Sequence, residues 1–221
     1  MPANEPEPSA AQGADILVLV AHPELEQSRA NRRLADAALA LQRGGGGIAV
    51  RDLYALYPDY LIDVDAEQAA LAAARLVVWQ QPIRWYGMPP LLKLWCDDVL
   101  AFGWAYGPGG TMLRGKDLWL VASTGGADES YRPDGYNRYF FDAFLPPYEQ
   151  TAALCGMRFL PPLLLHGAHK ASEAELAAHA EHYVGQLARY PDWPEIESVE
   201  PCPACEVPLS ARPIENVMEP V

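Results

Sequence analysis

The sequence predicts an α/β fold in which a doubly wound, five-stranded parallel sheet carries helices on both faces. Two observations lead to this prediction. Five short, almost uninterrupted apolar runs alternate with segments whose apolar residues repeat at helical spacing. Such runs suit strands buried on both faces, as parallel strands are. Strands that alternate with helices along the chain are typical of the doubly wound class.

The first strand and helix lie within residues 16–41 and set the plan of the chain. Residues 16–21 are all apolar, and a polar loop then leads to Ser28, a favoured helix N-cap. Free N–H groups and the positive end of the helix dipole meet at such a helix start, which predicts an anion site. The competing interpretation is a plain turn at residues 22–23 and a Ser28 that only caps the helix. The side chains expected to close around a phosphate are His22, Ser28, Arg29 and Asn31.

The remaining elements follow from the same patterns. Strands are expected at residues 48–53, 75–79, 118–122 and 159–165, the last at an edge because of its two prolines. Helices are expected at 65–74, 89–100, 147–155 and 172–190, the first and last of them opened by capping boxes. Residues 54–64 are interpreted as a loop.

Composition limits the possible functions. The chain has 221 residues, half of them hydrophobic, and a formal charge of −13. This length allows one large domain or two small ones. The negative charge argues against nucleic acid and against an anionic membrane surface as partners. With no apolar run near the roughly 20 residues of a membrane span and no disulfide framework, a cytoplasmic setting is expected.

The two ends of the chain differ from its middle. Residues 1–14 are rich in Pro, Ala and Glu and are interpreted as a disordered lead to a domain at residues 15–190. Residues 191–221 are interpreted as an extended Pro-rich tail. This tail contains a CxxC motif, Cys202 to Cys205, without a second ligand pair that would indicate zinc. No cluster elsewhere has metal-ligand spacing.

Three loops are expected at the carboxyl edge of the sheet, where doubly wound folds bind their ligands. They are residues 22–31, 80–88 and 123–138. The first offers the phosphate seat, the second an aromatic pair, Trp85 and Tyr86, and the third two glycines that allow close backbone approach. A planar ring system with a phosphate tail suits all three, and FMN has that shape. Ordinary packing of the aromatic pair and a plain glycine turn are the alternatives.

The same loops carry a family resemblance. Its motifs are Ala21-His22-Pro23, Ser28-Arg29-Ala30-Asn31, Asp52-Leu53-Tyr54, the run from Val78 to Trp95, Gly103-Trp104-Ala105-Tyr106-Gly107 and Ser123-Thr124-Gly125-Gly126. In this order they resemble the flavodoxin-like NAD(P)H:quinone oxidoreductases, in particular the ancillary flavoproteins of the bacterial glutathione-gated potassium efflux system. The resemblance covers about residues 15–190.

The resemblance implies a homodimer with bound FMN that reduces quinones with NADH or NADPH, in two ping-pong hydride transfers through flavin N5. It places phosphate contacts at His22, Ser28, Arg29, Ala30 and Asn31, the ring-flanking loop at Ile83, Arg84, Trp85 and Tyr86, and the polar ring edge at Ser123, Thr124, Gly125 and Gly126. Residues 102–106 would line the site of the partner subunit.

One departure concerns the proton donor to substrate. Relatives often carry a histidine after the Thr-Gly-Gly motif, whereas residues 127–139 contain none, so Tyr131 and Tyr136 are the candidates. His166 and His169 follow the last expected strand and could approach the site, but they are interpreted as loop residues. Three other functions stay open: a regulatory subunit of a membrane potassium antiporter, an azo- or nitro-compound reductase, and an electron carrier. The choice between NADH and NADPH is also open.

Overall fold

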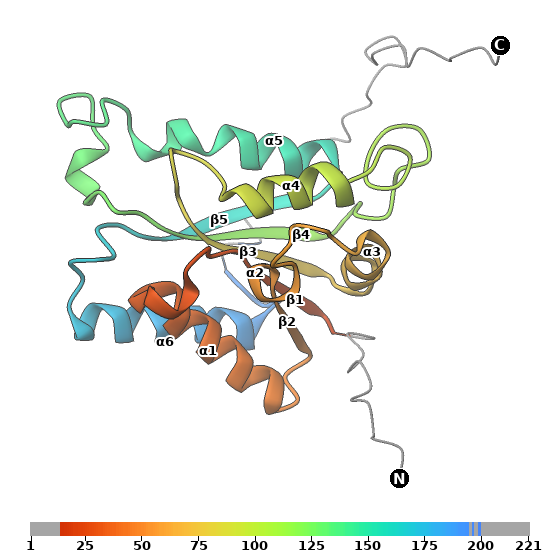
Figure 1. The fold of residues 1–221 in the computed structure, drawn as a ribbon, viewed down its shortest axis with the longest axis horizontal. Helices are drawn as coiled ribbons and strands as arrows, with labels where there is room; N and C mark the ends of the chain where they lie inside the picture. The colour runs from red at the N-terminus through yellow and green to blue at the C-terminus, as the bar shows by residue number, and fades with distance from the viewer. Residues whose placement is uncertain (1–13, 195, 197–198, 200–221) are drawn as a thin grey trace.

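The computed structural model describes residues 14–194, 196 and 199 (Figure 1). Its strands are β1 Ile16–Val20, β2 Ile48–Asp52, β3 Leu76–Pro82, β4 Asp117–Ser123 and β5 Arg158–Leu165. Its α-helices are α1 Arg29–Arg43, α2 Leu53–Leu56, α3 Val64–Ala73, α4 Pro90–Val99, α5 Pro146–Leu154 and α6 Glu173–Arg189. Three short 3₁₀ helices lie in loops: η1 Leu25–Gln27, η2 Asp128–Ser130 and η3 Phe141–Phe144.

The five strands form one parallel sheet in the order β2-β1-β3-β4-β5, which confirms the predicted fold class. The strand order reverses at β1, which pairs with both β2 and β3. Strand β5 lies at an edge, as its prolines predict, and its register with β4 shifts between Trp119 and Val121. Because every strand is parallel, all five carboxyl ends meet at one edge, on the left in Figure 1.

Alternate residues of each strand enter two separate cores, one on each face of the sheet. Leu17 and Leu19 of β1 face the core that α2, α3, α4 and α5 cover, whereas Val18 and Val20 face the core under α1 and α6. Figure 1 shows α4 and α5 above the sheet and α1 and α6 below it. Because both faces are covered, the strands read in sequence as continuous apolar runs.

Two local predictions around β2 and α3 are wrong. A one-turn helix, α2, occupies part of the expected loop because the Asp52 carboxylate accepts hydrogen bonds from the N–H groups of Tyr54 and Ala55. Helix α3 begins at Val64, before the proposed Asp65 capping box. Its cap is Asp63, whose carboxylate accepts from Ala66 N at 3.0 Å. Both differences arise because several aspartates lie close together in the sequence, and the one that accepts from the free N–H groups decides where each helix begins.

The packed domain continues past the boundary placed after Tyr190. Trp193 is 3% exposed, its ring lies 4.8 Å from that of Trp119, and its Nε1 donates to Gln186 O at 2.6 Å. Ile196 belongs to the same core. The CxxC motif and residues 1–13 lie outside the described residues. Within the described part of the chain, no helix is long and apolar enough to cross a membrane.

We expect Trp193→Ala to lower the free energy of unfolding by about 3–5 kcal/mol, because the substitution empties a packed aromatic site. Urea unfolding followed by far-ultraviolet circular dichroism measures the change. The control is Leu61→Ala, since Leu61 is 75% exposed. The control should stay within about 0.5 kcal/mol of the parent. Equal effects of the two substitutions would contradict the extended domain boundary.

Candidate functional site

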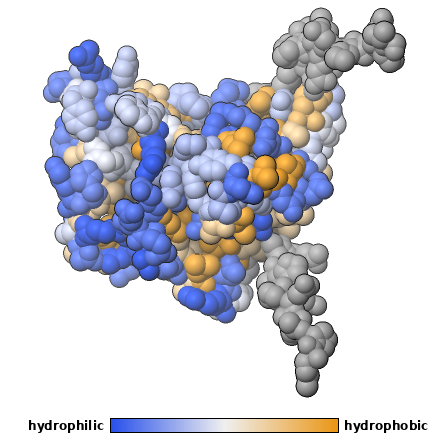
Figure 2. Space-filling model, viewed as in Figure 1, coloured by the Kyte–Doolittle hydropathy of each residue, from blue (hydrophilic) through white to orange (hydrophobic). Residues whose placement is uncertain are grey.

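A cavity of about 390 Å³ opens at the carboxyl edge of the sheet. Figure 2, in the same orientation as Figure 1, shows mostly hydrophilic side chains at this end of the molecule. Nine of the predicted site residues line the cavity: His22, Ser28, Arg29, Ala30, Ile83, Arg84, Ser123, Thr124 and Gly125. Four residues that were not predicted complete the lining: Gln27, Pro82, Ala168 and His169. Segments from β1, β3, β4 and β5 therefore meet here, as expected for a doubly wound sheet.

The start of α1 supplies hydrogen-bond donors to one end of the cavity. Ser28 caps the helix, with its Oγ accepting from Asn31 N at 3.1 Å. Within the described residues, the N–H groups of Arg29 and Ala30 have no hydrogen-bond acceptor. The Ser28 hydroxyl proton is not used by the cap and is free to donate. These donors and the helix dipole favour an anion.

His22 adds a neutral donor to the same end. Its Nδ1 accepts a hydrogen bond from Glu24 N at 3.1 Å, so the proton of the neutral imidazole lies on Nε2. Burial lowers the pKa of His22, the nearby Arg84 charge lowers it further, and Glu24 opposes both. The side chain is therefore a neutral N–H donor near pH 7.

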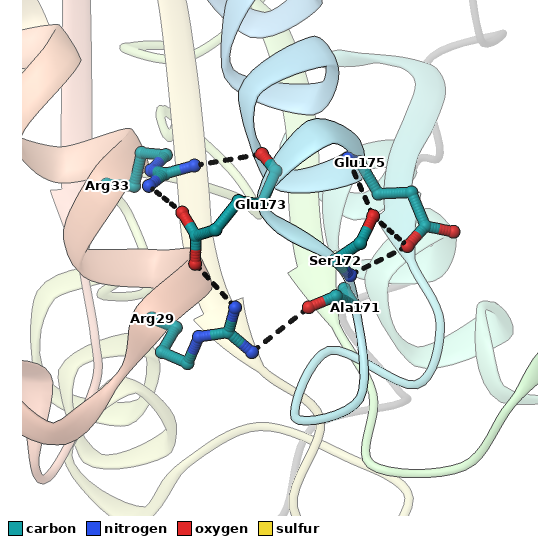
Figure 3. Close-up of polar contacts among 6 residues, drawn as sticks. All are labelled: Arg29, Arg33, Ala171, Ser172, Glu173 and Glu175. Carbon is teal, nitrogen blue, oxygen red and sulfur yellow. Dashed lines mark hydrogen bonds and ion pairs between the residues drawn. The ribbon is translucent and has the colours of Figure 1, made fainter.

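Arg29 is not a free cation at this site. Its guanidinium donates to Ala171 O at 3.0 Å and to Glu173 Oε1 at 2.6 Å, and Arg33 holds the other Glu173 oxygen at 2.6 Å (Figure 3). Hydrogen bonds from Arg29 and then Arg33 lower the pKa of Glu173. Arg29 thus offers the cavity its backbone N–H, while its side chain joins the starts of α1 and α6.

Asn31 was predicted to contact the phosphate, but its side chain points into the protein. It is 2% exposed, and its Nδ2 donates to Ser123 Oγ at 2.8 Å. The Asn31 carbonyl accepts from Gln80 Nε2 at 2.8 Å, and Gln80 Oε1 accepts from Tyr183 OH at 3.1 Å. Asn31 therefore positions the loops, and the backbone around it provides the anion donors.

The aromatic pair lies on a tight turn beside the cavity and does not line it. Residues 84–87 form a turn with two backbone hydrogen bonds of 3.1 Å. Trp85 and Tyr86 have φ values of +48° and +65°, left-handed conformations that are strained for large residues. Tyr86 stacks on Phe144 at 5.2 Å and donates to Asn137 Oδ1 at 3.3 Å, whereas Trp85 is 95% exposed.

The turn after β4, residues 124–126, has three backbone N–H groups, and two of them are free. Thr124 N donates to Leu165 O at 2.9 Å, which leaves only Gly125 and Gly126 with unused N–H groups in this described segment. A Cβ at Gly126 would lie 2.6 Å from Ser130 Oγ, so a larger residue would displace this hydroxyl from its hydrogen bonds to Ala127 O and Asn137 Nδ2. The turn therefore favours glycine and offers donors for a polar ligand edge.

The two candidate tyrosines have different environments. Tyr131 is 7% exposed and packs its ring edge-on against Phe141 and Phe144. Burial raises its pKa, and the Thr124 hydroxyl partly offsets this effect. Tyr136 is 74% exposed, yet its hydroxyl would lie 2.7 Å from a Cβ at Gly126. Both phenols thus lie near the glycine turn, one buried and one open to solvent.

The two histidines that follow β5, interpreted from the sequence as loop residues, both lie beside the turn at residues 124–126. His169 lines the cavity beside Gly125, and His166 Nδ1 lies 3.0 Å from Thr124 Oγ1. Their position directly after an expected strand was the signal, since that position lies at the carboxyl edge. Among the described residues, no group of three or more His, Cys, Asp or Glu is arranged to hold a metal ion.

The fold and this edge cavity define a flavodoxin-like α/β protein. Sequence comparison leads to the same class: a family model for the flavodoxin-like fold matches residues 14–187, and the chain belongs to that family.

Several relatives share most of this chain. The glutathione-regulated potassium-efflux system ancillary protein KefF of Citrobacter koseri is 47% identical over 78% of this chain and 94% of its own length. The structure of general stress protein 14 of Treponema denticola, which contains FMN, has 38% identity and a TM-score of 0.72 over 78% of this chain and 97% of its own. An NADPH-quinone reductase from P. pentosaceus has 25% identity and a TM-score of 0.69 over 77% and 95%.

The lowered pKa of His22 predicts a pH dependence of stability. Below about pH 6.5 the unfolded chain binds a proton at His22 more readily than the folded chain does. Its contribution to the free energy of unfolding is therefore present at neutral pH and lost as the pH falls. Between about pH 7.5 and 5.5, the parent should lose more stability than His22→Asn, as measured by urea unfolding. Parallel pH profiles for the two proteins would contradict this assignment.

Proposed function

We propose that this protein is an FMN-dependent NAD(P)H:quinone oxidoreductase. The observation that carries the proposal is a pair of free N–H groups in each of two turns, Arg29 with Ala30 and Gly125 with Gly126. Arg29, Ala30 and Gly125 line the cavity, and Gly126 follows directly. One pair suits a phosphate and the other suits the polar edge of a planar ring. The FMN-containing relative and the quinone reductase relative support the same function.

The donor set of the cavity is chemically suited to FMN. Ser28, Arg29, Ala30 and His22 would hold the phosphate, and Gly125 with Gly126 would donate to the ring edge. The donors in both places are neutral N–H and O–H groups, so the protein needs no unpaired cation to bind the anion. When bound, FMN supplies two-electron hydride chemistry between NADH or NADPH and a quinone.

The protein residues supply position and one proton. The strained turn at residues 84–87 is held by Tyr86 against Phe144, so Ile83 and Arg84 keep a fixed place at the cavity wall. Tyr131, and then Tyr136, are the proposed proton donors to the quinone oxygen. A phenol with a raised pKa keeps its proton until negative charge develops on the substrate.

A homodimer is part of this proposal. A second hollow, about 380 Å³ and mainly apolar, lies between α4 and α5 and is lined partly by Tyr106, Met88 and Tyr148. The neighbouring loop at residues 102–106 would reach the cavity of a second copy. Exposed aromatic residues, including Trp85 and Phe140, give such an interface apolar area to bury.

The relationship to KefF of Citrobacter koseri favours a second role as an ancillary subunit of a membrane potassium antiporter. In that role the protein would stay in the cytoplasm and reach the membrane through its partner. The two roles separate in purified protein, because turnover of a soluble quinone needs no antiporter. Azo and nitro compounds are alternative acceptors within the enzyme class.

We expect Ser28→Ala to weaken FMN binding about tenfold, because a charge-assisted hydrogen bond to the phosphate is lost. Riboflavin, which lacks the phosphate, should bind the variant and the parent equally. Ser172→Ala is the matched control, since Ser172 caps α6 and does not line the cavity. Fluorescence titration of both flavins measures the affinities. If Ser28→Ala weakens both flavins alike, or neither, the proposed phosphate seat is wrong.

Tyr131→Phe should slow quinone reduction by about a hundredfold and leave reduction by NAD(P)H near the parent rate, because only the proton donor is removed. Tyr136→Phe should have a smaller effect, since its hydroxyl is open to solvent water. Stopped-flow absorbance separates the two half-reactions. Parent rates with quinone in both variants would show that neither phenol is the proton donor.

A further inference from the structure

His166 supports the glycine turn from outside the cavity. Its Nδ1 lies 3.0 Å from Thr124 Oγ1, and Thr124 lines the cavity. Its ring packs 5.3 Å from Tyr131 and 5.1 Å from Phe141, and its Nε2 lies 3.8 Å from Asp128 Oδ1. A single hydroxyl therefore separates this imidazole from the proposed ring-edge donors.

The short contact between Thr124 and Gly126 favours one tautomer of the His166 imidazole. Thr124 Oγ1 is 2.7 Å from Gly126 O, and two oxygens at that distance need a proton between them. The Thr124 hydroxyl has one proton, which it donates to Gly126 O, so it accepts from His166 Nδ1–H. The Nε2 atom is then left unprotonated and faces the Asp128 carboxylate.

Two opposing effects set the pKa of the His166 imidazole. Burial lowers the pKa of His166, and the carboxylates of Asp128 and then Glu129, both on η2, act in the opposite direction. Tyr131 and Phe141 pack against the ring as neutral groups. The imidazole is therefore neutral near pH 7. The Asp128 carboxylate beside Nε2 would pair with the imidazolium if the ring took up a proton.

We propose that His166 takes up one proton at Nε2 when negative charge accumulates beside the turn at residues 124–126, and releases it when that charge leaves. The Nδ1–H bond to Thr124 is kept in both states, because protonation occurs at the other nitrogen. The new imidazolium pairs with Asp128 and acts on the cavity through Thr124. His166 is thus a positioning residue whose charge follows that of the ligand.

This inference rests on the proposed function, and the step balances. A hydride from NAD(P)H, two electrons and one proton, would leave a net negative charge at the ring edge of a bound flavin, and one proton from solvent would enter His166 at Nε2. When the hydride passed on to a quinone, His166 would return its proton to solvent. The proposed donor Tyr131, itself reprotonated from solvent, would supply the second proton of the hydroquinone.

Nuclear magnetic resonance of the holoprotein with ¹⁵N-labelled histidine tests the proposal directly. With oxidised FMN near pH 7, His166 should be the neutral Nδ1–H tautomer, and reduction with dithionite should raise its pKa by about one pH unit or more. Contacts to the Tyr131 and Phe141 rings identify its signal in the parent protein, without any variant. A His166 signal that keeps the same protonation state after reduction would overturn the proposal.

A second measurement uses His166→Asn, which keeps a donor near the Nδ1 position and cannot gain a proton. The midpoint potential of bound flavin should change less steeply with pH in this variant than in the parent between about pH 6 and 8. His182→Asn, at an exposed position of α6, should follow the parent curve. Equal slopes in His166→Asn and the parent count against the proposal.

The outcomes separate the two levels of the argument. A protein that binds no FMN defeats the proposed function and this inference together. A protein that binds FMN and reduces quinones while His166 stays neutral defeats the inference alone. If His166→Asn does not fold, the magnetic resonance experiment on the parent protein still decides the question.

Discussion

A buried chain of three hydrogen bonds holds the carboxyl edge of this protein together. Tyr183 of α6 donates to Gln80 of β3, Gln80 donates to the Asn31 carbonyl of α1, and Asn31 donates to Ser123 of β4. All four residues are at most 8% exposed. In a dry interior, each of these polar groups would cost free energy if it lost its partner. The hydrogen-bond series therefore permits one relative placement of the start of α1 and the turn after β4.

The ligand loops use neutral donors although two arginines lie beside them. Arg29 is paired with Glu173, and Arg84 with Glu24. Each guanidinium is therefore partly neutralised by a carboxylate, and the main attraction for an anion comes from oriented N–H groups and a helix dipole. In a chain of charge −13, anions are not attracted nonspecifically. The placement of the N–H groups therefore decides which anion binds.

The sequence predicted the layer architecture and most of the cavity lining, because both depend on local signals. Apolar runs identify parallel strands, and Ser28 marks the start of α1. Asn31 was predicted to contact the phosphate, but its side chain turns inward because Ser123, on a distant strand, accepts its hydrogen bond. Trp193 looked like part of a tail because its core position depends on Trp119, far away in the sequence.

The positions of two histidines also depend on residues far away in the sequence. His166 and His169 follow β5 in a loop with no motif of its own, and only the sheet order brings that loop beside β4. Thr124 was expected at the polar ring edge, but its N–H donates to Leu165 O at the end of the adjacent strand. Residues whose role depends on the neighbour across the sheet are therefore the ones that sequence patterns misplace.

The central claim is that FMN is held by two pairs of free backbone N–H groups, one at the start of α1 and one in the turn after β4. Titration of ¹⁵N-labelled protein with FMN, followed by amide chemical shifts, tests it most directly. The account predicts large shifts and slowed hydrogen exchange at Arg29, Ala30, Gly125 and Gly126, and smaller changes at Thr124, whose N–H is already bonded. Binding that leaves those four amides unperturbed, or no binding at all, would contradict it.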